Sequence, residues 1–189
     1  MTTTAPSISR LRVPELDELP SGLRSQIESI GNQLGYVPNW IRAFAVGGAH
    51  TQRFNTYLLA LLDPGGGVLP YADREVLATV TSAENGCSYC RLNHAGSLGE
   101  ALGDAKLGTR VSLDFREVGE LEPRHRVLAE FAAKLALRPN DVADSDIASL
   151  REIGLGDEEV FEAVHVVSAF AAANRFSIFL QVTPDDEFF

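Results

Sequence analysis

Cysteine is scarce in this sequence, with only Cys87 and Cys90 among 189 residues. Two cysteines are too few for the disulfide framework on which small secreted proteins depend. A closed structural zinc site normally needs four ligands, and no second cysteine pair exists to complete one. The CxxC spacing of the pair is instead typical of redox or metal chemistry.

Positive charge is also in short supply. Lys and Arg number 16 against 26 Asp and Glu, which gives a formal net charge of -10. Phosphate binding needs a basic surface, so we expect no nucleic-acid partner.

Residues 1–20 lack the apolar core of a signal peptide, which argues against export and favours a cytoplasmic protein with a poorly ordered N-terminal arm. The composition, 45% hydrophobic and 22% charged, predicts that residues 21–189 form a single folded domain.

Convincing β patterns are missing as well. Residues 110–114 are the one stretch that merits consideration as a strand, and apolar residues elsewhere recur at helical spacing, so the expected fold is all-α. The longest apolar run, Val164 to Ala173, contains His165 and is followed by Asn174 and Arg175. It ends well before the roughly twenty apolar residues that a membrane span requires. We therefore expect no membrane partner and a central or subunit-interface helix here.

Helix breakers and apolar spacing divide the chain into segments. Helices are predicted over residues 21–34, 39–46, 50–62, 73–83, from 87 or 88 onward, 101–113, 123–138, from 144 or 145 to 153, and 157–182. Asp144 or Ser145 is the expected N-cap of the eighth of these helices. The loop Asp63 to Gly67 is interpreted as a linker, because no strand precedes it and no GK[ST] follows, as a phosphate-binding loop would require.

The reactive residues gather between Glu75 and Gly96. On a helix, the spacing i, i+3, i+7 places Cys87, Cys90 and His94 along one stripe. A CxxC pair at a helix start can have a lowered thiol pKa, because free backbone N–H groups stabilise the thiolate.

The preceding helix carries Glu75, and the break at Asn85-Gly86 makes the two helices a hairpin. Glu75 lies eleven residues before Gly86 and His94 eight after it, so the two are at comparable distances from the turn. This geometry favours a chain of contacts from Glu75 to His94 to Cys90, in which a carboxylate orients an imidazole that activates a sulfur nucleophile.

Other interpretations of these residues remain open at this point. Cys87, Cys90 and His94 could bind zinc if a distant residue or another subunit supplied a fourth ligand. The thiols could also be inert and buried. Covalent haem attachment would need a histidine where Arg91 stands.

The spacing Glu75, eleven residues, Cys87-Ser88-Tyr89-Cys90, three residues, His94 resembles the E-x11-C-x2-C-x3-H signature of the AhpD-like alkylhydroperoxidases. These proteins belong to the carboxymuconolactone decarboxylase superfamily, and VTSAENGCSYCRLNHAGSL is similar to its peroxidase-related branch. The resemblance implies an AhpD-like helical bundle in which Cys90 attacks peroxide, Cys87 is the resolving sulfur, and Glu75 with His94 relays protons. The best-known AhpD proteins have a histidine directly before the second cysteine, where this chain has Tyr89.

The resemblance also implies an activity, a thiol-dependent peroxidase acting on hydrogen peroxide or organic hydroperoxides. Its expected partners are the peroxide substrate and a dithiol or thioredoxin-like reductant, with no cofactor and no metal. Related proteins form rings of identical subunits, so a homo-oligomer, trimer or hexamer, is expected. Two alternatives are a redox-sensing or partner-binding module of the same fold, and a carboxymuconolactone-type decarboxylase. Proton-transfer decarboxylation, however, has no need for two sulfurs.

Overall fold

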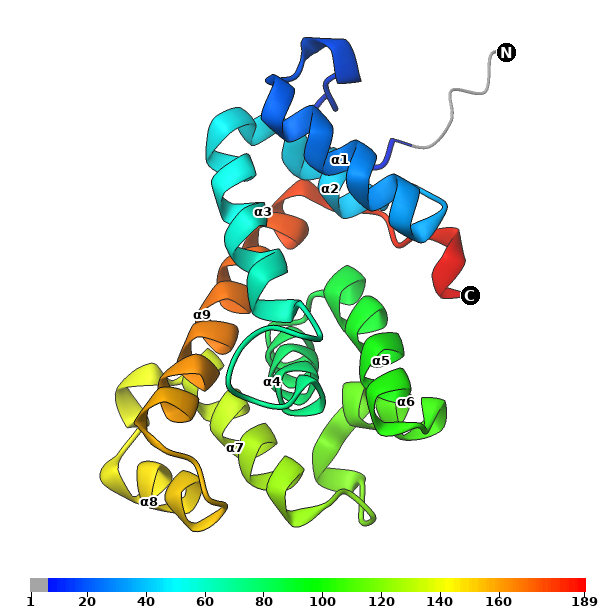
Figure 1. Ribbon diagram of the computed structural model, residues 1–189. Helices are drawn as coiled ribbons and strands as arrows, with labels where there is room; N and C mark the ends of the chain where they lie inside the picture. The colour runs from blue at the N-terminus through cyan, green and yellow to red at the C-terminus, as the bar shows by residue number, and fades with distance from the viewer. Residues whose placement is uncertain (1–6) are drawn as a thin grey trace.

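The computed structural model describes residues 7–189, and within this range the chain is helical with no β-strand (Figure 1). The predicted all-α fold is confirmed. The α-helices are α1 (Ser21–Leu34), α2 (Asn39–Phe44), α3 (Gly48–Leu62), α4 (Tyr71–Glu84), α5 (Ser88–Leu102), α6 (Ala105–Asp114), α7 (Pro123–Leu137), α8 (Asp144–Glu152) and α9 (Asp157–Leu180). Residues 110–114, considered as a strand, belong to α6.

Helix α4 lies at the centre, with α3, α5, α7 and α9 around it (Figure 1). Its residues 73–82 are all buried, so this part of the helix has no solvent-facing side. Buried polar side chains need partners. Asp73 pairs with Arg124 of α7, and Arg74 donates to the carbonyl oxygens of Leu61 and Asp63. These bonds fix the end of α3 and the glycine-rich linker against α4.

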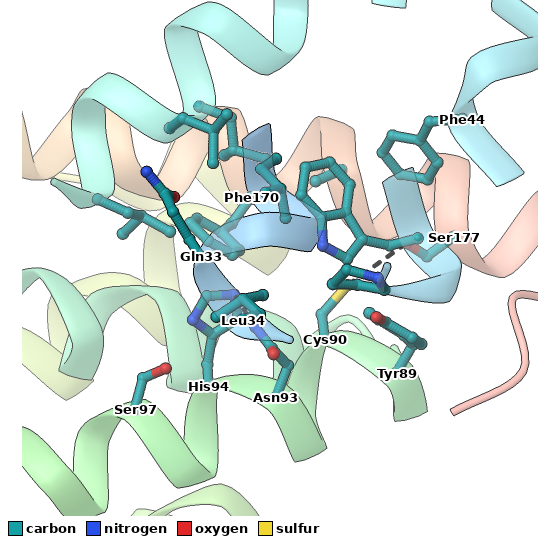
Figure 2. Close-up of a pocket in the computed structure, with 17 residues that line it drawn as sticks. Gln33, Leu34, Phe44, Tyr89, Cys90, Asn93, His94, Ser97, Phe170 and Ser177 are labelled. Carbon is teal, nitrogen blue, oxygen red and sulfur yellow. Dashed lines mark hydrogen bonds between the residues drawn. The ribbon is translucent and has the colours of Figure 1, made fainter. Parts of the chain in front are cut away.

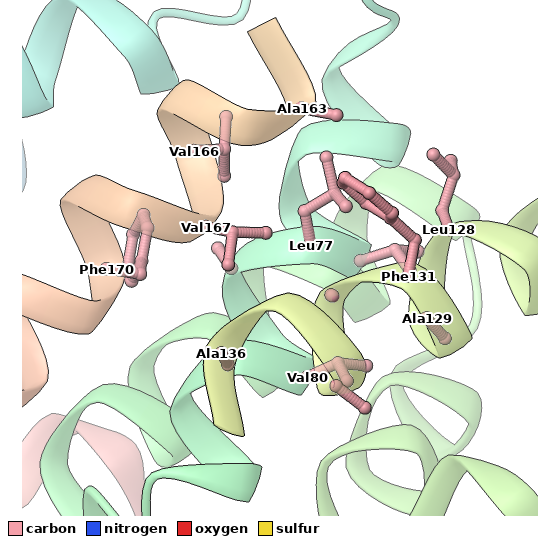
Figure 3. Packing of buried hydrophobic residues seen from close by; sticks show 14 of the residues in the cluster. Leu77, Val80, Leu128, Ala129, Phe131, Ala136, Ala163, Val166, Val167 and Phe170 are labelled. Carbon is pink, nitrogen blue, oxygen red and sulfur yellow. The ribbon is translucent and has the colours of Figure 1, made fainter. Parts of the chain in front are cut away.

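The main hydrophobic core fills the space between α4, α7 and α9 (Figure 3). Leu77 from α4, Leu128 from α7 and Phe170 from α9 are among its fully buried side chains. Burial of each such side chain contributes about 1.5–3 kcal/mol to folding. The core therefore fixes α9 against the hairpin that carries the cysteines.

Helix α9 is long and apolar, with a mean hydropathy of 1.4 over its most apolar window, of which half is buried. Length and composition alone would let it cross a bilayer, but the core helix of a soluble protein passes the same test. Its polar side chains bond inside the protein. The Glu162 carboxylate accepts from the Leu69 N–H, and the Asn174 amide donates to Ser82 Oγ at 3.0 Å. These contacts identify α9 as a central helix of the bundle.

Several predicted helix boundaries differ from the structure, and two of the differences occur at helix caps. The helix expected over 101–113 is two helices: α5 continues to Leu102, Gly103 reverses the chain in the left-handed conformation, and Asp104 caps α6 by accepting from two backbone N–H groups. The cap expected at Asp144 or Ser145 is also different. Asp146 instead accepts from the Ala143 N–H at 2.7 Å, which satisfies the start of α8 from inside the helix.

The N-terminal arm expected over residues 1–20 is described from residue 7 onward, and residues 1–6 lie outside the described range. The Arg10 N–H donates to the Leu180 carbonyl at 2.8 Å, and the Thr183 N–H donates to the Ile8 carbonyl. Ser9 is buried. This part of the arm is therefore bonded to the last residue of α9 and to the segment that follows it.

Helices α5 and α6 approach closely at a pair of glycines. A Cβ added at Gly108 would lie 2.4 Å from the Ala95 carbonyl oxygen and 2.6 Å from the Gly99 nitrogen, both backbone atoms that cannot move aside cheaply. We expect Gly108→Ala to lower the free energy of unfolding by about 1–3 kcal/mol, because the helices must separate. Gly96→Ala on the exposed side of α5 is the matched control, since a Cβ there meets nothing within 4 Å. Equal urea midpoints for the two variants would contradict this prediction.

Candidate active site

The turn between α4 and α5 presents the first cysteine at a helix start. Gly86 has a φ of 71°, a left-handed conformation that glycine adopts without steric cost. Cys87 is the N-cap of α5, and its sulfur accepts from the Cys90 backbone N–H at 3.3 Å. The predicted helix hairpin is therefore present, and it places Cys87 where free N–H groups stabilise negative charge.

The two thiols are free, buried and adjacent. The sulfurs lie 2.7 Å apart, and the side chains are 1% and 6% exposed for Cys87 and Cys90. The hydrogen bond between the two thiols, opposed by burial and assisted by the Cys90 N–H, lowers the pKa of Cys87 to about 7. The same hydrogen bond, together with burial, raises the pKa of Cys90 above that of an ordinary thiol. The pair therefore loses its first proton near neutral pH, with the charge on Cys87.

Glu75 and His94 form the carboxylate–imidazole contact that the sequence predicted. His94 Nδ1 lies 2.8 Å from Glu75 Oε2, and both side chains are buried. The Thr79 hydroxyl donates to the His94 carbonyl, and the Phe170 ring packs edge-on against the imidazole at 4.6 Å between centroids. Two helices thus hold the imidazole with its Nε2 edge directed away from Glu75.

The expected contact between His94 and Cys90 does not form. Among the described residues, no hydrogen bond joins them; His94 Nε2 lies 3.3 Å from the Asn93 amide nitrogen instead. The Cys90 sulfur is within reach of Cys87 and, at 3.5 Å, of Ser177 Oγ. The imidazole and the thiol nevertheless line the same cavity.

That cavity, called the first cavity below, has a volume of about 280 Å³ (Figure 2). Figure 2 shows Cys90 and His94 projecting from α5 into a space that Gln33 and Leu34 of α1 cover from the opposite side. Its apolar walls include Trp40, Phe44, Leu58, Leu59, Leu62, Phe170 and Ala173. Apart from the Cys90 thiol and the Tyr89 phenol, His94 is the one ionisable side chain among the described residues that line the cavity. The cavity therefore suits an uncharged organic molecule.

Comparison with solved structures identifies the family. A structure described as the alkylhydroperoxidase AhpD core, a peroxidase-related protein from Ralstonia eutropha JMP134, is 31% identical and has a TM-score of 0.91. The match covers 98% of this chain and 96% of that one. The chain belongs to the AhpD-like, peroxidase-related family.

Other comparisons agree with this assignment or add the fold alone. A peroxidase-related protein from Silicibacter sp. TM1040 is 28% identical, with a TM-score of 0.87 over 100% of this chain and 97% of that one. A cysteine-to-alanine variant of the debrominase Bmp8, in complex with 2,3,4-tribromopyrrole, is 14% identical with a TM-score of 0.75 over 95% of each chain, which shows a shared fold. No family model matches the sequence, and no curated protein matches it either.

In this AhpD-like chain, Tyr89 takes the place of the histidine that the best-known members have. The Tyr89 hydroxyl donates to Asp185 in the segment after α9, and the Phe188 ring packs against the phenol. Burial and the hydrogen bond to Asp185 raise the pKa of Tyr89, so its hydroxyl stays protonated at neutral pH. Tyr89 is therefore a neutral wall of the site, held in place by Asp185.

Sequence reasoning missed the residues that α9 contributes to this AhpD-like site. Ser177 lies beside Cys90, and Asn174 is completely buried between Ser82 and Asn85. Both side chains lower the pKa of each thiol by hydrogen bonding. The only signal in the sequence is that Asn174 and Ser177 interrupt an apolar run three residues apart, which places them on one helix face.

Two other histidines lie away from this site. His165 pairs with the Tyr57 hydroxyl of α3 at 2.6 Å. His125 contacts Asp73 at the far end of α4. In residues 7–189, no group of three or more His, Cys, Asp or Glu side chains is arranged to hold a metal ion.

Proposed function

We propose that this AhpD-like protein is a thiol-dependent peroxidase that reduces organic hydroperoxides, and hydrogen peroxide, through Cys90 and Cys87. One observation carries the proposal: Cys90, next to a second thiol, shares a mostly apolar cavity with an imidazole that a buried carboxylate orients. A sulfur nucleophile, a resolving sulfur and a proton donor are the groups that the reaction requires.

The first step in this proposal is attack of the Cys90 sulfur on the terminal peroxide oxygen. The Cys90 proton passes to the Cys87 thiolate, the O–O bond breaks, and Cys90 becomes a sulfenic acid. The alkoxide leaving group takes a proton that His94 has first received from solvent at Nε2, while Glu75 holds the imidazole in position across the cavity. The products of this step are an alcohol and the sulfenic acid.

The second step joins the two sulfurs. The Cys87 sulfur attacks the Cys90 sulfenic acid, water leaves, and a disulfide forms. A dithiol or a thioredoxin-like protein must then reduce the disulfide by exchange.

In this proposal the protein is a cytoplasmic homo-oligomer, trimer or hexamer, and the exposed Phe161 and Phe179 of α9 support association through that helix.

The proposed function is tested by mixing the reduced protein with one equivalent of cumene hydroperoxide in a stopped-flow instrument. We expect loss of both thiols, one cumyl alcohol per chain, and a Cys87–Cys90 disulfide by mass spectrometry. Because the pKa of Cys87 is about 7, the rate constant should rise with pH through neutrality, where the pair loses its first proton, and level off above it. Thiols that oxidise no faster than free cysteine would contradict the proposal and favour a redox sensor.

A further inference from the structure

The two cysteines line two different cavities. Cys90 lines the first cavity, whereas Cys87 lines a second cavity of about 400 Å³ that Cys90 does not reach. The walls of the second cavity come from the start of α5, the end of α9 and residues 181–184. Tyr89 and Ser177 line both cavities, so these two side chains form the partition between them.

We propose that the second cavity admits the reductant, a small dithiol, which attacks Cys87, while peroxide enters only the first cavity. This inference rests on the proposed function. A thiolate attacks a disulfide at one sulfur and expels the other. A thiolate in the second cavity can reach only the Cys87 side of the pair, so Cys90 is the leaving sulfur.

The exchange is balanced with a dithiol. Its first thiolate bonds to Cys87 Sγ, the Cys87–Cys90 bond breaks, and the electron pair goes to Cys90, which takes up a proton. Its second thiolate then attacks the reductant sulfur of the mixed disulfide, and Cys87 leaves with the electron pair. The reductant departs as a disulfide, and the protein regains both thiols.

The surroundings of the sulfurs stabilise both leaving groups. The hydrogen bond to Cys87, which is the largest cause of the high pKa of Cys90, is lost once Cys87 carries the mixed disulfide. Ser177 and Asn174 remain, and their hydrogen bonds favour the Cys90 thiolate. In the second displacement, Cys87 leaves at the N-cap of α5, where the Cys90 N–H stabilises its thiolate.

The size of the reductant follows from burial. Cys87 is 1% exposed, so any reductant has to displace side chains of the second cavity to reach its sulfur, which a slender dithiol does more easily than the surface of a folded protein. The rim is polar and uncharged where Ser88, Gln181 and Thr183 contribute, which suits a neutral molecule. Residues 181–184 are bonded to the N-terminal segment through Thr183, so the rim is fixed.

Two substitutions, each placing a larger side chain in one cavity, test whether peroxide and the reductant enter by different cavities. Ile178 is 46% exposed and lines the second cavity, and Leu34 is 55% exposed and lines the first. We expect Ile178→Trp to slow re-reduction of the oxidised protein by dithiothreitol roughly tenfold, because exchange depends on access to the sulfur, while the peroxide step keeps its rate. Leu34→Trp should slow the peroxide step and leave re-reduction unchanged. Slower re-reduction in Leu34→Trp but not in Ile178→Trp would overturn the inference.

A second measurement locates the attacked sulfur directly. Oxidised protein is mixed with glutathione, quenched with acid and fragmented in a mass spectrometer; glutathione on Cys87 is the expected result, and glutathione on Cys90 would overturn the inference. Diamide can form the disulfide for both experiments without peroxide. Failure of the peroxidase proposal would appear as a missing peroxide step, whereas failure of this inference would appear in re-reduction alone.

Discussion

Cys90→Ser is expected to lower the rate of peroxide-driven thiol oxidation by roughly 10³-fold or more, because loss of a nucleophile leaves only the contribution of binding. Cys90 is the sulfur that lines the first cavity with His94, so no other thiol can meet peroxide there. Cys87→Ser should still consume one equivalent of hydroperoxide, more slowly, and stop with a sulfenic acid on Cys90. Stopped-flow kinetics and mass spectrometry of the dimedone adduct measure both outcomes.

Because its pKa is lowered, Cys87 is the other sulfur that could attack peroxide. If Cys87 itself attacked peroxide, Cys90→Ser would retain fast oxidation and Cys87→Ser would lose it. Serine is close to cysteine in size, so the unfolding midpoints of both variants should match that of the wild-type protein and serve as the control for folding. Retained turnover in Cys90→Ser would therefore reassign the two sulfurs without removing the peroxidase function.

His94→Ala is expected to lower the rate of the peroxide step by about 10²–10⁴-fold, the usual contribution of a positioned general acid or base. It also leaves the Glu75 carboxylate buried without its partner, which should lower the free energy of unfolding by about 3–5 kcal/mol. Both effects come from one contact of 2.8 Å, so a loss of activity alone would not separate chemistry from folding.

The double variant His94→Ala, Glu75→Gln makes that separation. Removing the unpaired charge should recover part of the lost stability, measured by urea unfolding, without recovering peroxide reduction. Glu75→Gln alone keeps a hydrogen-bond acceptor for Nδ1 and serves as the matched single variant. Activity that returned together with stability would show that His94 has a structural role only.

Much of the fold was predictable because the residues at the ends of a helix indicate where it starts and stops. The Glu122-Pro123 start predicted α7 to within a residue, and the apolar spacing predicted α9 with its end two residues too late. The failures have local causes. Gly103 is the C-cap of α5 and Asp104 is the N-cap of α6. Because the two caps are adjacent, apolar spacing alone does not separate the end of α5 from the start of α6.

The site was predictable only in part, for a related reason. Glu75 and His94 meet because two helices of known rise run back from one turn, and that calculation needs no other part of the chain. The predicted contact of His94 with Cys90 failed although both lie on one face of α5. The imidazole contacts Glu75 on α4, and the Cys90 sulfur contacts Cys87 at the start of α5, so the two side chains turn toward different partners.

The sequence by itself determined the all-α class, the hairpin at Gly86 and the contact of Glu75 with His94, because each depends on neighbours within a few helical turns. Only the tertiary structure decided that Ser177 lies beside Cys90, 87 positions away, and that Asp185 fixes Tyr89 from 96 positions away. It also decided that the two cysteines line separate cavities. Contacts of this kind depend on how all the helices pack at once, and no local pattern of residues encodes that packing.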